Sequence, residues 1–287
     1  MKHQLISHVT KLYTTAKQHM PFAENNETRI YLEEHGSGEP LLLIAGLGST
    51  LLSWRHLLPA LSEKYRVIVF DNRGAGRSSD INGSVSLQEM AADAVAVMDA
   101  AETTTAHVMG TSMGGMIAQE LVLNYPGRVR SLILAVTTCG GREAVLADME
   151  VLTTLQLVGD MSAEAAFWAM APFIYDPSTP RSVLEDDLVV RLSTKLKTEN
   201  YAAQLQAIRE WQGTASRLGQ IDVPALILYG ENDRLIPPQN SLDLARLISR
   251  SELMRLENAS HMFAADRTYR AVEILLRFLS GRPATKE

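Results

Sequence analysis

The chain has 287 residues, a net charge of -6, 46% hydrophobic residues and 21% charged residues. This ordinary globular composition suits one large domain with an insertion as well as two small domains. The mild acidity, without a run of basic residues, argues against nucleic acid as the main partner. No stretch approaches the ~18 apolar residues of a transmembrane helix, and residues 1–20 lack a signal-peptide pattern. The one cysteine, Cys139, fits a reducing compartment, so we expect a cytoplasmic protein.

The first predicted element is an N-terminal helical extension in residues 1–20. Apolar residues between Leu5 and His19 recur at helical spacing, with lysines on other faces. Such a helix docks on its own domain, on a partner or on a membrane surface, and the sequence leaves these alternatives open.

A strand, a helix and a second strand follow the extension. Residues 28–36 indicate a strand and lead through a tight turn to a continuous apolar run at residues 40–46. A helical pattern covers residues 54–64, and a second fully apolar strand covers residues 65–71. This order predicts a right-handed crossover and a parallel sheet.

Residues 105–125 carry the pattern of a nucleophile elbow. An apolar run ends in Gly110-Thr111-Ser112-Met113-Gly114, and an unbroken helical pattern follows. Such a sharp reversal forces Ser112 into a sparsely populated backbone conformation, and crowding makes glycine suitable at positions 110 and 114. We expect the Ser112 hydroxyl to stand above the carboxyl edge of the sheet, beside the N-terminus of the following helix.

The pattern changes after the next strand, residues 128–136. Residues 137–220 contain several helical segments and no β-type run. Strand and helix alternation resumes with predicted strands at 223–230 and 251–257 and helices at 238–249 and 268–280. These boundaries predict an α/β core of residues 21–136 and 221–287, with residues 137–220 as a helical cap over the carboxyl edge.

The elbow and its neighbouring segments resemble the α/β-hydrolase superfamily from about Thr28 to Leu279. The loop DNRGAGRS is similar to the DxRGxGxS loop common in that superfamily. With GLGSTLLSW and YAAQLQAIREW, it resembles most the serine hydrolase branch of 3-oxoadipate enol-lactonases and small carboxylesterases. The resemblance implies a mostly parallel twisted sheet flanked by helices with an inserted helical cap, and a reaction that needs neither metal nor organic cofactor.

A serine hydroxyl needs a base, and the base needs a group that holds its tautomer. Among the seven histidines, His261 follows the final strand in a short loop at the carboxyl edge, so it is the predicted base. Two carboxylates, Glu231 and Asp233, follow the strand before it. The superfamily pattern G-x-x-D-x-x-x-P matches residues 230–237, so the resemblance implies the catalytic triad Ser112, Asp233 and His261.

An oxyanion hole needs two donors, and the first is the N–H of Met113 at the start of the elbow helix. The superfamily takes the second from the loop after the first parallel strand, where Leu47 holds the matching place. Ala45 replaces the histidine often found there, which leaves the backbone donor in place and puts the rigidity of the loop in question.

The elbow serine predicts acyl transfer, because the superfamily members that form alkyl-enzyme esters have aspartate there. We expect a carboxylic ester or lactone as substrate, although thioesters, amides and certain carbon-carbon bonds are cleaved with the same groups. Trp168, Phe173 and Trp211 would line an apolar pocket or form the core of the cap itself. Arg209 or Arg142 would pair with an anionic substrate. The alternative is a ligand sensor or partner-binding protein that has the hydrolase fold but little turnover. The sequence does not predict the oligomeric state.

Overall fold

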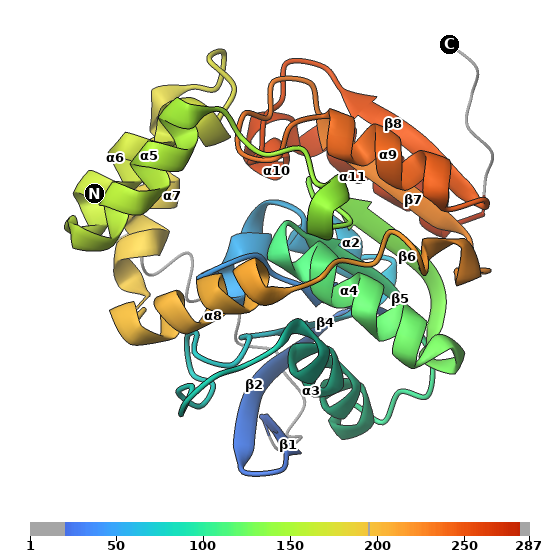
Figure 1. Cartoon of the computed structure of the whole chain (residues 1–287). Helices are drawn as coiled ribbons and strands as arrows, with labels where there is room; N and C mark the ends of the chain where they lie inside the picture. The colour runs from blue at the N-terminus through green and yellow to red at the C-terminus, as the bar shows by residue number, and fades with distance from the viewer. Residues whose placement is uncertain (1–20, 195, 282–287) are drawn as a thin grey trace.

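The structure is a computed structural model that describes residues 21–194 and 196–281 (Figure 1). Residues 1–20, with the predicted helical extension, lie outside the described part. Eight strands form one sheet in the order β1-β2-β4-β3-β5-β6-β7-β8. Their bounds are β1 (Phe22–Asn25), β2 (Thr28–His35), β3 (Glu39–Ile44), β4 (Tyr65–Phe70), β5 (Ala106–Thr111), β6 (Val129–Ala135), β7 (Ala225–Gly230) and β8 (Ser251–Leu256).

Strand β2 pairs antiparallel with both β1 and β4, and every other pair of neighbouring strands is parallel. The short strand β1 was not predicted, because its four residues carry no alternating apolar pattern. The inner strands read as continuous apolar runs because both of their faces are covered. Along β3, for example, Leu41 and Leu43 enter one apolar cluster while Leu42 and Ile44 enter the other.

Helices cover both faces of the sheet. On one face lie α3 (Leu87–Ala100), α4 (Met113–Asn124) and α9 (Gln239–Leu247); on the other lie α2 (Leu58–Ser62), α10 (Phe263–Asp266) and α11 (Thr268–Leu279). The helix expected at residues 54–64 is divided into the 3-10 helix η1 (Leu51–His56) and α2. Pro59 lies in the first turn of α2, where its missing N–H breaks no intrahelical bond.

Four helices lie between β6 and β7 and are called here the helical insertion: α5 (Met149–Leu157), α6 (Ala163–Ile174), α7 (Arg181–Ser193) and α8 (Thr198–Glu210). Figure 1 shows α5, α6 and α7 grouped to the left of the sheet, apart from the helices that flank it. The Asp148 and Ser162 side chains accept backbone N–H bonds at the starts of α5 and α6, as N-cap residues do. Short 3-10 turns complete the chain at η2 (Pro126–Arg128), η3 (Gly141–Glu143), η4 (Val158–Asp160) and η5 (Leu218–Gln220).

The predicted α/β class, with a mostly parallel sheet flanked by helices, is confirmed by this architecture. Within the described ranges, no helix combines the length and apolar character needed to cross a bilayer. The parallel strands also fix where a site can form, because the loops that leave β3, β5, β7 and β8 meet at one edge of the sheet.

Candidate active site

Ser112 occupies the sharp turn between β5 and α4. Its φ of 55 and ψ of -121 belong to a backbone region that residues other than glycine rarely adopt. A Cβ atom at Gly110 would lie 2.1 Å from the carbonyl oxygen of Gly114, and one at Gly114 would lie 2.0 Å from that of Ile44. Neither contact can be relieved by a side-chain rotation, so both glycines are required by the close approach of backbone to backbone.

Asp233 and His261 are joined by a hydrogen bond. The Nδ1–H of His261 donates to Oδ2 of Asp233 at 2.8 Å, and the backbone N–H groups of Leu235 and Ile236 donate to Oδ1 at 2.9 and 2.8 Å. With all three bonds made, this carboxylate is only 3% exposed. Its bond to Nδ1 leaves Nε2 of the ring as the nitrogen available to act as a base. Glu231, the alternative acid, is exposed.

The loops that carry these residues share the carboxyl edge of the sheet. Ser112 follows β5, Asp233 follows β7 and His261 follows β8, and these strands are parallel. The loop after β3 reaches the serine as well, because a Cβ atom at Gly46 would lie 3.3 Å from Cβ and 3.8 Å from Oγ of Ser112. Four loops distant in the chain therefore converge on one region.

Each predicted oxyanion donor is the residue that follows one partner of this close approach. Leu47 follows the glycine that touches Ser112, and Met113 is the first residue of α4. Since the first N–H groups of a helix have no intrahelical acceptor, the Met113 N–H is available to a ligand. It also lies at the positive end of the helix dipole, where developing negative charge is stabilised.

Side chains from distant segments hold the loop after β3. The Asn72 amide donates to the carbonyl of Ala45 at 2.9 Å, and the N–H of Gly48 donates to Oε1 of Gln204 at 2.9 Å. The guanidinium of Arg191 donates to the carbonyl of Gly48 at 2.7 Å. Ala45 put the rigidity of this loop in question, and these bonds hold the loop through its backbone. Gln204 and Arg191 lie in α8 and α7, and no local pattern in the sequence pointed to either.

Arg191 is the cation that lies beside this loop. Burial lowers the pKa of its guanidinium below the usual range, opposed by the neighbouring Tyr201. Its side chain is only half-buried, and among the described residues no ion pair joins it to a carboxylate. Arg209 and Arg142, which the sequence suggested for an anionic substrate, are both exposed. The half-buried positive charge beside the loop after β3 therefore comes from α7.

The three predicted pocket residues occupy different surroundings. Trp168 packs edge to face on Phe167 and belongs to a small apolar cluster that includes Met262, the residue after His261. Phe173 is buried at the end of α6. Trp211 is in the main core, where its indole N–H donates to the buried carboxylate of Glu120 at 2.7 Å. Trp168 and Phe173 thus lie in the helical insertion, while Trp211, which follows α8, bonds the end of the insertion to α4.

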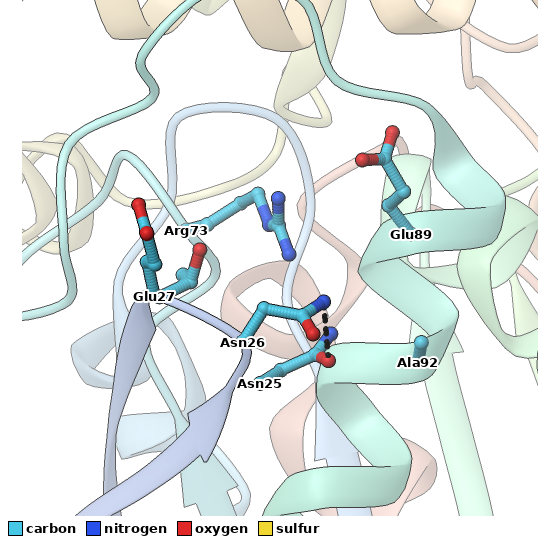
Figure 2. Close-up of a pocket in the computed structure, with 7 residues that line it drawn as sticks. Asn25, Asn26, Glu27, Arg73, Glu89 and Ala92 are labelled. Atoms are coloured by element: carbon cyan, nitrogen blue, oxygen red, sulfur yellow. Dashed lines mark hydrogen bonds between the residues drawn. The ribbon is translucent and has the colours of Figure 1, made fainter.

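A polar hollow of about 420 Å³ lies elsewhere, between the β1–β2 turn and α3 (Figure 2). Figure 2 shows Arg73 pointing toward it between Glu27 and Glu89. The Arg73 guanidinium already makes two hydrogen bonds to the buried Asp93, at 2.5 and 2.6 Å. None of the proposed catalytic or oxyanion-hole residues lines this hollow. Across residues 21–281, apart from the masked position 195, no three histidine, cysteine or carboxylate side chains gather as metal ligands.

Comparison with known proteins bears on the family and the fold. The sequence profile of the alpha/beta hydrolase fold family matches residues 39–268. The carbamate hydrolase RutD of Azorhizobium caulinodans is 32% identical over 249 residues, which cover 86% of this chain and 93% of that protein. The 2-hydroxy-6-oxononadienedioate/2-hydroxy-6-oxononatrienedioate hydrolase of Burkholderia vietnamiensis is 29% identical, covering 89% and 92%.

Among solved structures, the enol-lactonase from Burkholderia xenovorans LB400 superposes with a TM-score of 0.80. The superposition covers 91% of this chain and 100% of that one, with 23% identity. At this identity the likeness concerns the fold.

Proposed function

Because this chain belongs to the alpha/beta hydrolase fold family, we propose that it is a serine hydrolase that cleaves a carboxylic ester or lactone through an acyl-enzyme on Ser112. The observation that carries the proposal is the strained elbow serine, at φ 55, on the same sheet edge as the hydrogen-bonded Asp233–His261 pair. A lone strained serine has many explanations. Together with a base whose tautomer is set by a buried carboxylate, it has the parts that nucleophilic catalysis requires.

The first step forms the acyl-enzyme. Nε2 of His261 takes the Ser112 proton while Oγ attacks the carbonyl carbon, and the oxyanion that forms accepts bonds from the Leu47 and Met113 N–H groups. Asp233 keeps the imidazole in the required tautomer and stabilises its positive charge. The carbon-oxygen bond then breaks, and the leaving alkoxide takes the proton from His261. An ester releases its alcohol at this point, whereas a lactone keeps it attached to the acyl group.

The second step releases the acid. His261 takes a proton from water, the resulting hydroxide attacks the acyl carbon, and the same two N–H groups hold the second oxyanion. When this intermediate collapses, the bond to Oγ breaks and His261 returns a proton to Ser112. Neither step requires a metal or an organic cofactor.

The proposed substrate carries a carboxylate in addition to the bond that is cleaved. Arg191 supports this proposal, because its half-buried guanidinium donates to the Gly48 carbonyl through one nitrogen and keeps further N–H donors for a second, charged acceptor. The Burkholderia vietnamiensis relative is named for a dioate, which is a dicarboxylate. Residues 137–220 would then be a cap that brings Arg191, Trp168 and Phe173 to the pocket, inserted in a core of residues 21–136 and 221–287. We propose the cytoplasm as the compartment, because the single cysteine, Cys139, fits a reducing environment.

A substrate panel with pre-steady-state kinetics tests the proposal. Chromogenic esters, lactones, thioesters and carbamates, each with and without a free carboxylate, are ranked by kcat/KM. We expect turnover of an ester or lactone, a burst of alcohol equal to the enzyme concentration, and an acyl adduct on Ser112 by mass spectrometry. Ser112→Ala abolishes the burst and the adduct. A preference for carbamates would replace the ester assignment, and tight ligand binding without turnover would identify a sensor.

A further inference from the structure

The segment that joins α6 to α7 runs across the loops of both proposed catalytic partners of Ser112. It comprises residues 173–179, of which the first two are the end of α6, and is called here the connector. The backbone N–H of Met262 donates to the carbonyl of Ile174 at 2.7 Å, and the Ser260 hydroxyl lies 3.4 Å from the carbonyl of Phe173. Ser260 and Met262 are the two neighbours of His261, so the connector contacts the backbone on both sides of the base.

Asp176 extends this contact to the acid. Its Oδ2 accepts the amide of Asn232 at 2.7 Å, and Asn232 immediately precedes Asp233. Burial raises the pKa of Asp176, but hydrogen bonds from Ser178 and Asn232 outweigh burial and hold the pKa below its usual range. The carboxylate is therefore ionised at neutral pH and is a strong acceptor for the residue beside the catalytic acid.

Asp266 links the connector to the base from the opposite side. Its Oδ1 accepts the Thr179 hydroxyl at 2.6 Å, and its Oδ2 accepts the backbone N–H of Ser260 at 2.7 Å. This one buried carboxylate thus bridges the connector and the residue that precedes His261. It is 7% exposed, so water offers little replacement for either bond.

The connector is itself tied to the helix that follows the oxyanion loop. The Tyr175 hydroxyl donates to Oδ2 of Asp187 at 2.6 Å, and Oδ1 of Asp187 lies 2.9 Å from Nε2 of His56. Arg55 forms an ion pair with the same carboxylate. Both Arg55 and His56 belong to η1, so the connector is bonded to the loops after β7 and β8 and is linked through Asp187 of α7 to η1.

We infer that the connector is a positioning clamp for the Asp233–His261 pair, with Asp176 and Asp266 as its positioning residues; this rests on the proposed function. A segment that only docked the insertion could bond anywhere on the core. Here the bonds converge on residues 232, 260 and 262, the immediate neighbours of the acid and the base. A displacement of about 1 Å at such a pair costs roughly 100-fold in rate, so the clamp acts on kcat.

The test compares near-isosteric variants with a matched control. Asp176→Asn and Asp266→Asn each place an amide N–H against a hydrogen-bond donor. Thr179→Val removes the hydroxyl that donates to Asp266, whereas Thr179→Ser retains it. The control is Asp186→Asn, an exposed carboxylate of α7 in the same insertion. For each variant kcat, KM, the pH dependence of kcat/KM and the melting temperature are measured on the best substrate. The downfield proton resonance of His261 Nδ1–H, assigned by its loss in His261→Ala, is recorded as well.

We expect kcat to fall about 10- to 100-fold in the three clamp variants, with KM changed by less than about threefold. The Nδ1–H resonance and the apparent pKa of the base should shift, while Thr179→Ser and Asp186→Asn behave as the parent protein. Lower melting temperatures with unchanged kcat and resonance would overturn the clamp, as would equal losses in Asp186→Asn. If the parent hydrolyses nothing in the panel, the proposed function fails, yet the resonance still decides whether the clamp holds the pair.

Discussion

Asp233→Asn separates the role of a charge from that of a hydrogen-bond acceptor. The asparagine Oδ1 still accepts the two backbone N–H groups of Leu235 and Ile236, so the free energy of unfolding should change by only about 1 kcal/mol. Its Nδ2 then faces Nδ1 of His261 and, as a donor, favours the tautomer with the proton on Nε2. That tautomer cannot take the Ser112 proton. Loss of this orientation costs about 10⁴-fold in kcat, or roughly 5.5 kcal/mol of transition-state stabilisation.

The matched control is Glu231→Gln, two residues away in the same loop. Glu231 is exposed, and its carboxylate lies 3.4 Å from the guanidinium of Arg255, a surface ion pair of little energetic weight. The kcat of Glu231→Gln should stay within about twofold of the parent value. Initial rates with a chromogenic ester and urea unfolding curves measure both variants. The assignment of the acid is wrong if Glu231→Gln is inactive while Asp233→Asn retains activity.

Three further predictions concern the elbow, the substrate and the pH dependence of folding. Gly114→Ala drives a Cβ atom against the backbone of Ile44, so kcat should fall at least about 100-fold and the unfolding free energy by about 1–3 kcal/mol; near-parental kinetics would contradict the elbow geometry. Arg191→Gln should raise KM about 10- to 100-fold more for a carboxylate-bearing ester than for its neutral counterpart, since loss of the bond to Gly48 affects the loop after β3 for both; equal effects on both esters would remove Arg191 from substrate recognition. Burial raises the pKa of Glu33, but hydrogen bonds from neighbouring side chains outweigh it and hold the pKa below 4.5. The stability that Glu33 contributes is thus present above the unfolded pKa and lost as pH falls through the folded pKa. The difference in unfolding free energy between the parent and Glu33→Gln, measured with urea, should therefore shrink from pH 7 to pH 3. A difference that stays constant over this range would refute the argument.

Local chemistry made most of the fold predictable. The inner strands are continuous apolar runs, and the helix before the elbow strand begins at a capping box formed by Ser86 and Glu89. Where the prediction differed, the cause was also local: β1 is too short to show a pattern, and Pro59 begins a new helix inside one expected segment. The strain at Ser112 was inferable because strand, glycines and helix are contiguous in the chain.

The substrate side of the site was not predictable in the same way. Arg209 and Arg142 have the charge that the sequence argument asked for, yet both face solvent, while Arg191 is held beside Gly48. Trp211 and Trp168 are the same type of residue, but the indole N–H of Trp211 donates to the buried Glu120. Residue type indicates what a side chain is able to do, and only its surroundings decide whether it contacts a ligand.

The sequence by itself determined the class of fold, the elbow and the order of the proposed triad, because each follows from short-range patterns or from the fact that parallel strands share a carboxyl edge. Only the tertiary structure decided which carboxylate meets His261, which arginine lies beside the loop after β3, and that Asp176 and Asp266 accept hydrogen bonds from the neighbours of the acid and the base. The Asp233–His261 contact spans 28 residues, the Asp176–Asn232 contact spans 56, and the bond from Arg191 to the Gly48 carbonyl spans 143. Separations of this length are closed by the packing of the whole chain, and no window of sequence contains both partners.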